Sequence, residues 1–370
     1  MTDEAVFSDI DQAMMNAVKE GVFPGGVLLW ANREKIFYHK GFGVADLATR
    51  VPVDPETVFD LASLTKPLAT TLAVADLVKT GQLKTETCVG DILPDARGTD
   101  KDSISIDMLL RHTSGLPAHR EYFKKVKRSF AEARLEIRNL VIKEPLIEKP
   151  GEKELYSDLG YILLAWVVEH LSGMRLDKFV QERIYDPLRI SRLYFGDLVQ
   201  YKTASNREGK IDIPAATSDC LWRKKLIIGE VEDENAWAAG GIEGHAGLFG
   251  DAMCVYKLCC EIMAAIDGES VVLNSDVIKT FLRKKDGLER VAGFDTPSKS
   301  DSSSGSYFSN RAIGHLGFTG TSFWMDPEDG LIAILLTNRV HPSRENIKIK
   351  SFRPQIHDLI SSNYNRNILL

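Results

Sequence analysis

Hydrophobic residues recur at helical spacing around Ser63, at Leu61, Leu64, Leu68, Leu72 and Ala75, and the pattern stops at Gly81. Pro67 is tolerated only near the start of a helix because its ring nitrogen carries no N–H. The sequence therefore predicts a long helix that begins at or just after Ser63, so that the serine hydroxyl stands beside unpaired backbone N–H groups.

The two ends of the chain show the same kinds of pattern in reverse order. A helix over 6–20 is followed by strands over 27–31 and 35–38, and near the other end strands over 312–325 and 331–337 precede a helix near 355–361. This order predicts an α/β fold of the α+β type, in which terminal helices flank an antiparallel sheet and a helical subdomain is inserted. We expect one catalytic domain over 6–361, with a sheet subdomain from about 6–60 and 287–361 and a helical subdomain from about 61–286.

A second candidate position precedes the most hydrophobic stretch of the chain. Residues 159–171 are apolar almost all round, which is typical of a buried helix. Asp158 suits the N-cap of this helix and Gly173 suits its end. Tyr156 is therefore predicted to lie in the loop that enters a buried helix, where its hydroxyl would be held rigidly.

Composition and the absence of some motifs exclude several classes of partner and cofactor. The chain has 370 residues and a net charge of −6, which gives no electrostatic reason to expect a nucleic-acid partner. Neither a Cys-x-x-Cys nor a His-Glu-x-x-His motif is present, so no metal or other cofactor is expected, and Cys259 and Cys260 are interpreted as buried free thiols. No apolar run reaches membrane-spanning length, and residues 1–4 do not resemble a signal peptide. We therefore expect a cytoplasmic protein, or a periplasmic one if a leader has been removed.

The spacing of Ser63 and Lys66 gives the first indication of chemistry. Residues three apart on a helix project from the same face. The helix dipole and burial would both favour a neutral Lys66 amine, which could take a proton from Ser63 and turn it into a nucleophile. Taken alone, such a pair is more often a helix cap followed by a solvated lysine, so the nucleophile needs support from other motifs.

Three motifs occur in one order: Ser63-x-x-Lys66, then Tyr156-Ser157-Asp158, then His315-Leu316-Gly317. Together they resemble the three motifs of the serine β-lactamase and penicillin-binding protein superfamily. The tyrosine of the second motif is similar to the class C β-lactamase branch, which also contains D-Ala-D-Ala carboxypeptidases, D-aminopeptidases and family VIII carboxylesterases. The resemblance extends over nearly the whole chain, from about residue 6 to residue 361.

The resemblance implies a role for each matching residue. Ser63 would be the nucleophile, while Lys66 and Tyr156 would share the proton transfers, with Tyr156 as general base once Lys66 lowers its pKa. The backbone N–H groups of Ser63 and Phe318 would form an oxyanion hole. Substrate-binding positions would be those of Asp158, His315, Leu316 and Gly317.

Two departures from the family pattern change these expectations. Asp158 stands where asparagine is usual, which favours a protonated Lys66 and places proton acceptance on Tyr156. Leu316 stands where threonine is usual, so a hydroxyl suited to a substrate carboxylate is missing. A protonated His315 could compensate for that loss, or Thr319 or Thr321 could replace the hydroxyl.

Other polar and aromatic residues are interpreted as structural. We expect His112 and His245 to bond loop backbone, and Trp237 and Trp324 to fill space rather than wall the cleft.

The sequence thus predicts a serine hydrolase that forms an acyl-enzyme on a small ester, amide or peptide substrate, with a carboxylesterase-like activity favoured. The alternatives are a β-lactamase, D-Ala-D-Ala carboxypeptidase or D-aminopeptidase-like activity, or a penicillin-binding sensor protein that acylates once without turnover.

Overall fold

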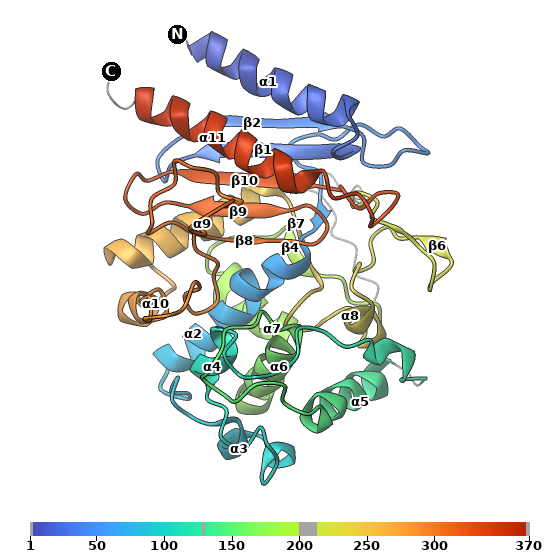
Figure 1. The fold of residues 1–370 in the computed structure, drawn as a ribbon, viewed down its shortest axis with the longest axis vertical. Coiled ribbons are helices and arrows are strands. Elements are labelled where there is room, and N and C mark those ends of the chain that lie inside the picture. Colours follow the sequence, from blue (N-terminus) through green and yellow to red (C-terminus); the bar gives the residue numbers. More distant parts are fainter. Residues whose placement is uncertain (1–2, 128–129, 200–212, 368–370) are drawn as a thin grey trace.

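A five-stranded antiparallel sheet forms one half of the molecule in this computed structural model, which describes residues 3–127, 130–199 and 213–367. The strand order is β2-β1-β10-β9-β8, so both ends of the chain build one sheet, as predicted (Figure 1). Its strands are β1 Gly25–Ala31, β2 Ile36–Gly43, β8 Ile313–Leu316, β9 Ser322–Met325 and β10 Ile332–Thr337.

Helices cover both faces of this sheet. Helices α1 (Asp3–Lys19) and α11 (Ile349–Asn367) lie on one face, and α9 (Ala252–Asp267) lies on the other. All seven residues of β1 are buried, because alternate side chains of this strand enter the two hydrophobic layers. Helix α9 contains the predicted thiols Cys259 and Cys260, and both cysteines are free.

The other half of the molecule is helical, and α6 (Asp158–Ser172) lies at its centre. This helix is apolar all round because neighbouring helices surround it, and it ends at Gly173 in the left-handed conformation with φ of 69°. Ser157 rather than Asp158 caps its start, since the Ser157 hydroxyl accepts a hydrogen bond from the N–H of Gly160. The remaining helices are α2 Leu72–Lys79, α3 Val89–Ile92, α4 Ile106–Leu110, α5 Phe130–Lys143, α7 Leu176–Val180, α8 Glu234–Ala238 and α10 Ser275–Phe281.

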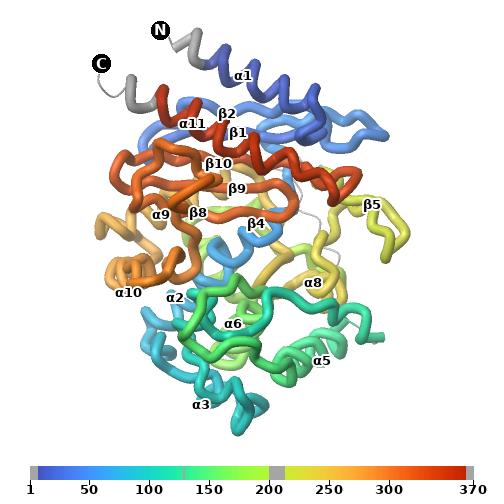
Figure 2. Tube along the Cα trace, in the orientation of Figure 1, coloured from blue at the N-terminus to red at the C-terminus, as the bar shows by residue number. Residues whose placement is uncertain are grey.

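Short elements connect the two halves. A small sheet has the order β3-β7-β4, with β3 Phe59–Asp60, β4 Leu193–Phe195 and β7 Leu248–Gly250, and a separate hairpin pairs β5 Asp219–Cys220 with β6 Lys225–Leu226. Single turns are η1 Ala62–Leu64, η2 Lys66–Thr71, η3 Pro94–Ala96, η4 Tyr122–Lys124 and η5 Gln181–Tyr185. The chain leaves β3 through η1 and η2 into α2, between the sheet and the helical half (Figure 2).

Two predicted elements are interrupted in the structure. The single strand predicted over 312–325 is wrong, because a turn over 317–321 divides it into β8 and β9; the N–H of Gly317 donates to the carbonyl of Thr321, and Gly320 has φ of 108°. The helix predicted after Ser63 is present over 65–79, although the π-helical turn η2 interrupts its α-helical hydrogen-bond pattern before α2. Pro67 lies in the first turn of η2, where its missing N–H costs no hydrogen bond.

The predicted division into a sheet subdomain and a helical subdomain stays a prediction, and residues 200–212 of the helical part lie outside the described residues. Within the described part of the chain, none of the helices combines the length and the apolar character that crossing a membrane requires.

Candidate active site

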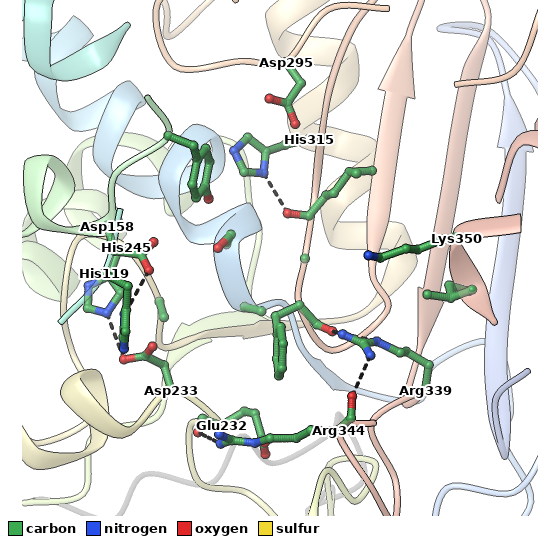
Figure 3. A pocket seen from close by; sticks show the side chains of 18 of the residues that line it. His119, Asp158, Glu232, Asp233, His245, Asp295, His315, Arg339, Arg344 and Lys350 are labelled. Atoms are coloured by element: carbon green, nitrogen blue, oxygen red, sulfur yellow. Dashed lines mark hydrogen bonds and ion pairs between the residues drawn. The ribbon is translucent and has the colours of Figure 1, made fainter. Parts of the chain in front are cut away.

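A cavity of about 670 Å³ lies between the β8 edge of the large sheet and the helical half (Figure 3). Seven of the residues to which the sequence assigned a role line this cavity: Ser63, Tyr156, Asp158, His315, Leu316, Gly317 and Phe318. The eighth, Lys66, is completely buried and contacts Ser63. The structure therefore brings all the predicted site residues together.

Ser63 follows a residue with a strained backbone. Ala62 has φ of 48°, a conformation that residues with a side chain seldom adopt. An Asp60 carboxylate oxygen accepts a hydrogen bond from the N–H of Ala62 at 2.8 Å, and the Thr65 hydroxyl donates to the Ala62 carbonyl at 2.6 Å. The other Asp60 oxygen accepts from the N–H of Glu232 at 2.6 Å. These buried contacts hold the strained turn that presents Ser63 to the cavity.

Lys66 connects Ser63 to the second motif. Its Nζ lies 2.9 Å from Ser63 Oγ and 2.8 Å from Asp158 Oδ1, and it also donates to the carbonyl of His245 at 3.1 Å. Burial lowers the pKa of Lys66, but the charge of Asp158, the charge of Tyr156 and the hydrogen bonds with both residues together outweigh this effect and raise the pKa above its ordinary value. The expectation of a neutral Lys66 amine is therefore wrong, and the expectation that Asp158 favours the protonated form is confirmed.

The Tyr156 ring is packed among cations and another ring. It lies 4.5 Å from the His112 ring, and Lys66 Nζ and the Arg290 guanidinium lie 4.8 and 5.6 Å from its centroid. Burial and the charge of Asp158 together raise the pKa of Tyr156 more than the charge of Lys66 and hydrogen bonds with Lys66 and Ser63 lower it. The prediction that Lys66 brings the Tyr156 pKa below its usual value is thus wrong, because it ignored how deeply the phenol is buried.

The turn between β8 and β9 is fixed to the segment that carries Ser63. The hydroxyls of Thr319 and Thr321 are buried and donate to the carbonyls of Asp60 and Leu61 at 2.7 and 3.1 Å. Neither hydroxyl can replace the missing one at Leu316, which corrects that expectation.

The N–H of Phe318 donates no hydrogen bond to another described residue, and the Phe318 carbonyl accepts from Arg339. Phe318 and Ser63 both line the cavity.

His315 and Leu316 line the sheet side of the cavity, as the third motif predicts. His315 Nδ1 lies 2.9 Å from the Leu316 carbonyl, and burial lowers the His315 pKa to about 4. His315 is therefore neutral at physiological pH. The expectation that a protonated His315 compensates for Leu316 is wrong, because residue spacing does not reveal how deeply this ring is buried.

The residues interpreted as structural differ in what they contact. His112 accepts a hydrogen bond from the N–H of Ser157 at its Nδ1, which confirms the expectation of a backbone contact. The His245 ring instead pairs with the carboxylate of Asp233 at 2.8 Å, so for this residue the expectation was incomplete. Trp237 and Trp324 are not among the residues that line the cavity.

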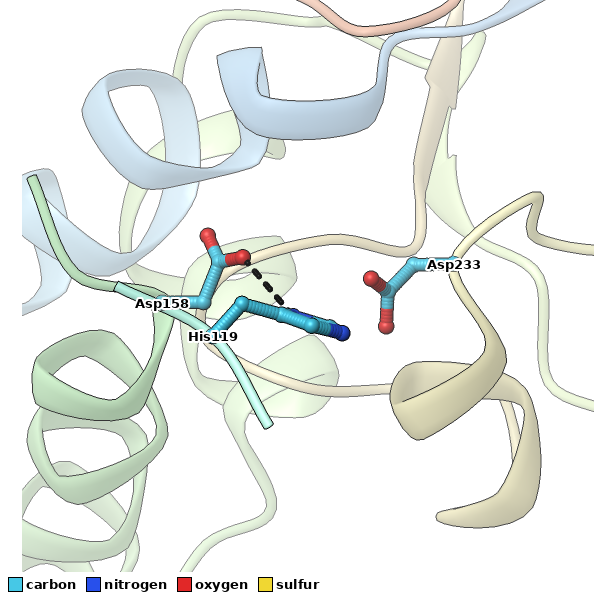
Figure 4. Close-up of side chains that lie close together, drawn as sticks. All are labelled: His119, Asp158 and Asp233. Atoms are coloured by element: carbon cyan, nitrogen blue, oxygen red, sulfur yellow. Dashed lines mark ion pairs between the residues drawn. The ribbon is translucent and has the colours of Figure 1, made fainter. Parts of the chain in front are cut away.

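Sequence reasoning missed an acidic and histidine-rich side of the cavity. His119 Nδ1 lies 3.4 Å from Asp158 Oδ2, and ligand-type atoms of His119, Asp158 and Asp233 all lie within 4.8 Å of one another (Figure 4). A metal ion here would compete with Lys66 for Asp158 and with His245 for Asp233. The arrangement is better explained as a chain of ion pairs than as a metal centre, and no spacing in the sequence indicated it.

The opposite side carries cations that were also missed. Arg344 pairs with Glu232 and Glu234, each at 2.6 Å. Arg339 and Arg353 are buried and donate to backbone carbonyls, and among the described residues neither forms an ion pair with a carboxylate. The lining also includes Lys350 and Arg290. Isolated basic residues of this kind are usually solvated, so the sequence offered no signal for them.

Comparisons with known proteins identify similar sequences and similar structures. A sequence model of the family described as Beta-lactamase matches residues 10–353. A relative from Salmonella agona (strain SL483), described as a putative D-alanyl-D-alanine carboxypeptidase, is 28% identical, and the alignment covers 92% of this chain and 84% of the relative.

Among solved structures, EstCE1, described as a hydrolase with promiscuous acyltransferase activity, is 20% identical with a TM-score of 0.72, covering 95% of this chain and 99% of that one. The octameric penicillin-binding protein homologue from Pyrococcus abyssi is 19% identical with a TM-score of 0.70, covering 98% and 80%. Both structures share the fold of this chain.

Proposed function

The chain belongs to the Beta-lactamase family and is a serine hydrolase, and from that premise we propose that Ser63 attacks an ester or amide carbonyl to form an acyl-enzyme. The observation that carries the proposal is the 2.9 Å distance between Lys66 Nζ and Ser63 Oγ, at the wall of a cavity that Tyr156 also lines. A serine becomes a strong nucleophile when an adjacent group takes its proton.

Tyr156 is the proposed proton acceptor, because Lys66 retains its positive charge beside Asp158. The resting pair of Lys66 ammonium and Tyr156 phenol first releases one proton to solvent. As Ser63 Oγ attacks, its O–H bond breaks and the proton passes to Tyr156, which returns it to the leaving group. Water then repeats the sequence and releases the acyl group. Lys66 and Arg290 stabilise the phenolate form of Tyr156.

The backbone N–H groups of Ser63 and Phe318 are the proposed oxyanion hole. The free N–H of Phe318 and the position of Ser63 at the start of a helical segment support this assignment. Preorganised donors of this kind stabilise the negative oxygen of a tetrahedral intermediate without reorganisation.

An uncharged ester is the favoured substrate class, because Leu316 offers no hydrogen bond to a substrate carboxylate beside the cavity. The N–H of Gly317 donates to the carbonyl of Thr321, and the Gly317 carbonyl accepts from Arg353. The proposed contact of Gly317 with substrate is therefore a van der Waals contact.

A D-Ala-D-Ala carboxypeptidase-like activity is the second candidate. Arg339, Arg353 and Lys350 put positive charge on one side of the cavity, and a relative carries that description. A β-lactamase or D-aminopeptidase-like activity, and a penicillin-binding protein without turnover, are further outcomes of the same experiment.

The test is a time course of p-nitrophenol release from p-nitrophenyl butyrate, beside nitrocefin, a D-Ala-D-Ala peptide and a D-amino-acid amide. Steady turnover of the ester after any burst supports an esterase, and a burst of one equivalent without turnover supports a sensor. Ser63→Ala should abolish both turnover and covalent labelling by a fluorophosphonate. Labelling of Ser63→Ala at the wild-type rate contradicts Ser63 as nucleophile.

The proposed location is the cytoplasm. All five cysteines of the chain are free thiols, a state that reducing compartments maintain. Cell fractionation with an antibody to the native protein tests this location, and recovery from the periplasm would contradict it.

A further inference from the structure

Asp158 is shared between two positively charged or chargeable groups. Its Oδ1 lies 2.8 Å from Lys66 Nζ, and its Oδ2 lies 3.4 Å from His119 Nδ1 (Figure 4). The chain of contacts therefore runs from Ser63 through Lys66 and Asp158 to His119, whose side chain is 40% exposed at the cavity wall.

The charge of Asp158 works against the activation of Ser63. It raises the pKa of Lys66, and it also raises the pKa of Tyr156. The Lys66–Tyr156 pair must lose one proton before it can accept the proton of Ser63. A carboxylate beside this pair makes that loss harder, whereas a neutral side chain at the same position would not.

His119 is placed to cancel this charge. Three carboxylates face it within the described residues: Asp158 at the start of α6, and Asp233 and Glu234 at the start of α8. The hydrogen bond with Asp158 is the largest cause that raises the pKa of His119, and the charges of Asp233 and Glu234 act in the same direction. His245 and Lys66 are the cations beyond those carboxylates, and each is already paired with one of them.

We propose that a protonated His119 offsets the charge of Asp158 and thereby allows the Lys66–Tyr156 pair to release the proton that activation of Ser63 requires. His119 is a positioning residue, because it acts through Asp158 and does not touch the reacting atoms. The inference rests on the proposed roles of Ser63, Lys66 and Tyr156. No bond to carbon changes in this step. The O–H bond of Tyr156 breaks and solvent takes the proton, while Lys66 keeps its positive charge and His119 keeps its own proton.

The pH dependence has a definite sign. Below the pKa of His119 the wild-type protein has the offsetting charge, and His119→Gln does not. Above that pKa the wild-type imidazole is neutral as well. At mildly acidic to neutral pH, kcat/KM of wild type should therefore exceed that of His119→Gln by about tenfold. This factor corresponds to a change of about one unit in the pKa of the Lys66–Tyr156 pair. At alkaline pH the two values should become equal.

The experiment measures kcat/KM for p-nitrophenyl butyrate from pH 5 to 10 in wild type, His119→Gln and His119→Lys, each also combined with Asp158→Asn. His119→Lys keeps a cation and should retain wild-type activity at neutral pH. In the Asp158→Asn background there is no charge to offset, so His119→Gln should have no effect. Thermal unfolding of each variant verifies that it folds.

Two results overturn the inference: a loss in His119→Gln that is the same at every pH, or a loss that persists at equal size in the Asp158→Asn background. Either would indicate a merely structural histidine. Failure of the proposed function is recognised separately, because it would appear as full activity in Ser63→Ala, whatever His119 does.

Discussion

Arg290 places its guanidinium 5.6 Å from the centroid of the Tyr156 ring. The same guanidinium pairs with Glu154 at 2.5 Å and with Asp295 at 2.7 Å, so it is held firmly in this position. Because a phenolate forms more easily beside a cation, this contact affects how readily Tyr156 gives up its proton.

Replacement of this cation should slow the reaction. In Arg290→Gln, the carboxylates of Glu154 and Asp295 lose their positively charged partner, and the pKa of Tyr156 should rise. The kcat/KM for an ester should therefore fall about tenfold at pH 7, and the acidic limb of its pH profile should move to higher pH. Arg290→Lys retains the charge and is the matched control. A pH profile identical to that of wild type in Arg290→Gln would exclude this electrostatic role.

Tyr156→Phe removes one hydroxyl from the entrance of α6. Loss of a general base typically costs about 10² to 10⁴ in rate, so acylation should slow by this order while KM for the ester stays near its wild-type value. Stopped-flow measurement of the p-nitrophenol burst gives the acylation rate directly. Activity within a few-fold of wild type would remove Tyr156 from the mechanism.

Leu316 should disfavour substrates that carry a carboxylate at this position. A lost charge-assisted hydrogen bond is on the order of 1.5–3 kcal/mol, so wild type should turn over p-nitrophenyl butyrate faster than nitrocefin. Since His315 has a pKa of about 4, the preference should stay constant from pH 6 to 8. Leu316→Thr should shift the ratio of the two kcat/KM values toward nitrocefin. A wild-type preference for nitrocefin would instead indicate that Arg353 and Lys350 hold the carboxylate.

Chelation should leave the rate unchanged. The carboxylates of Asp158 and Asp233 already have partners in Lys66 and His245, and the proposed reaction uses no metal. Prolonged dialysis against EDTA followed by an ester assay checks this expectation, with an assay in added Zn²⁺ or Mn²⁺ as the control. A loss of activity that is restored by added metal would indicate that Asp158 and Asp233 bind a metal ion.

Stability should depend on a buried ion-pair cluster that joins α5, α6 and Glu243. Arg138 contacts Glu243 at 3.1 Å and Glu169 at 2.6 Å, and the Glu243 side chain is completely buried. Breaking a buried pair leaves an uncompensated charge, so Arg138→Met should lower the free energy of unfolding by about 3 kcal/mol. Lys149→Met breaks the exposed pair with Glu152 and should cost about 0–1 kcal/mol. Equal effects of the two substitutions in urea unfolding would contradict this reasoning.

Local patterns in the sequence were sufficient to locate Ser63, Lys66 and Tyr156. Pro67 restricts where a helix can begin, and the apolar run that ends at Gly173 makes α6 a buried helix. Each of these signals depends on residues within one turn or one helix, which is why a single sequence contains them.

Other features depend on contacts between distant segments. Phe318, Thr319 and Thr321 favour strands, yet the hydroxyls of both threonines bond to the Asp60–Leu61 segment and the chain turns there. The pairing of His119 with Asp158 has no signature in residue spacing. The pKa of Tyr156 depends on burial, which the sequence pattern does not measure.

The carbonyls of Gly317 and Phe318 flank the N–H of Phe318, and arginine side chains bind both of them. Arg339 holds the Phe318 carbonyl, and Arg353 at the beginning of α11 holds the carbonyl of Gly317. The tilt of the adjacent N–H is thus set by side chains from the last tenth or so of the chain. Substitutions in the part of the chain that follows β10 can consequently alter turnover while Ser63, Lys66 and Tyr156 remain the same.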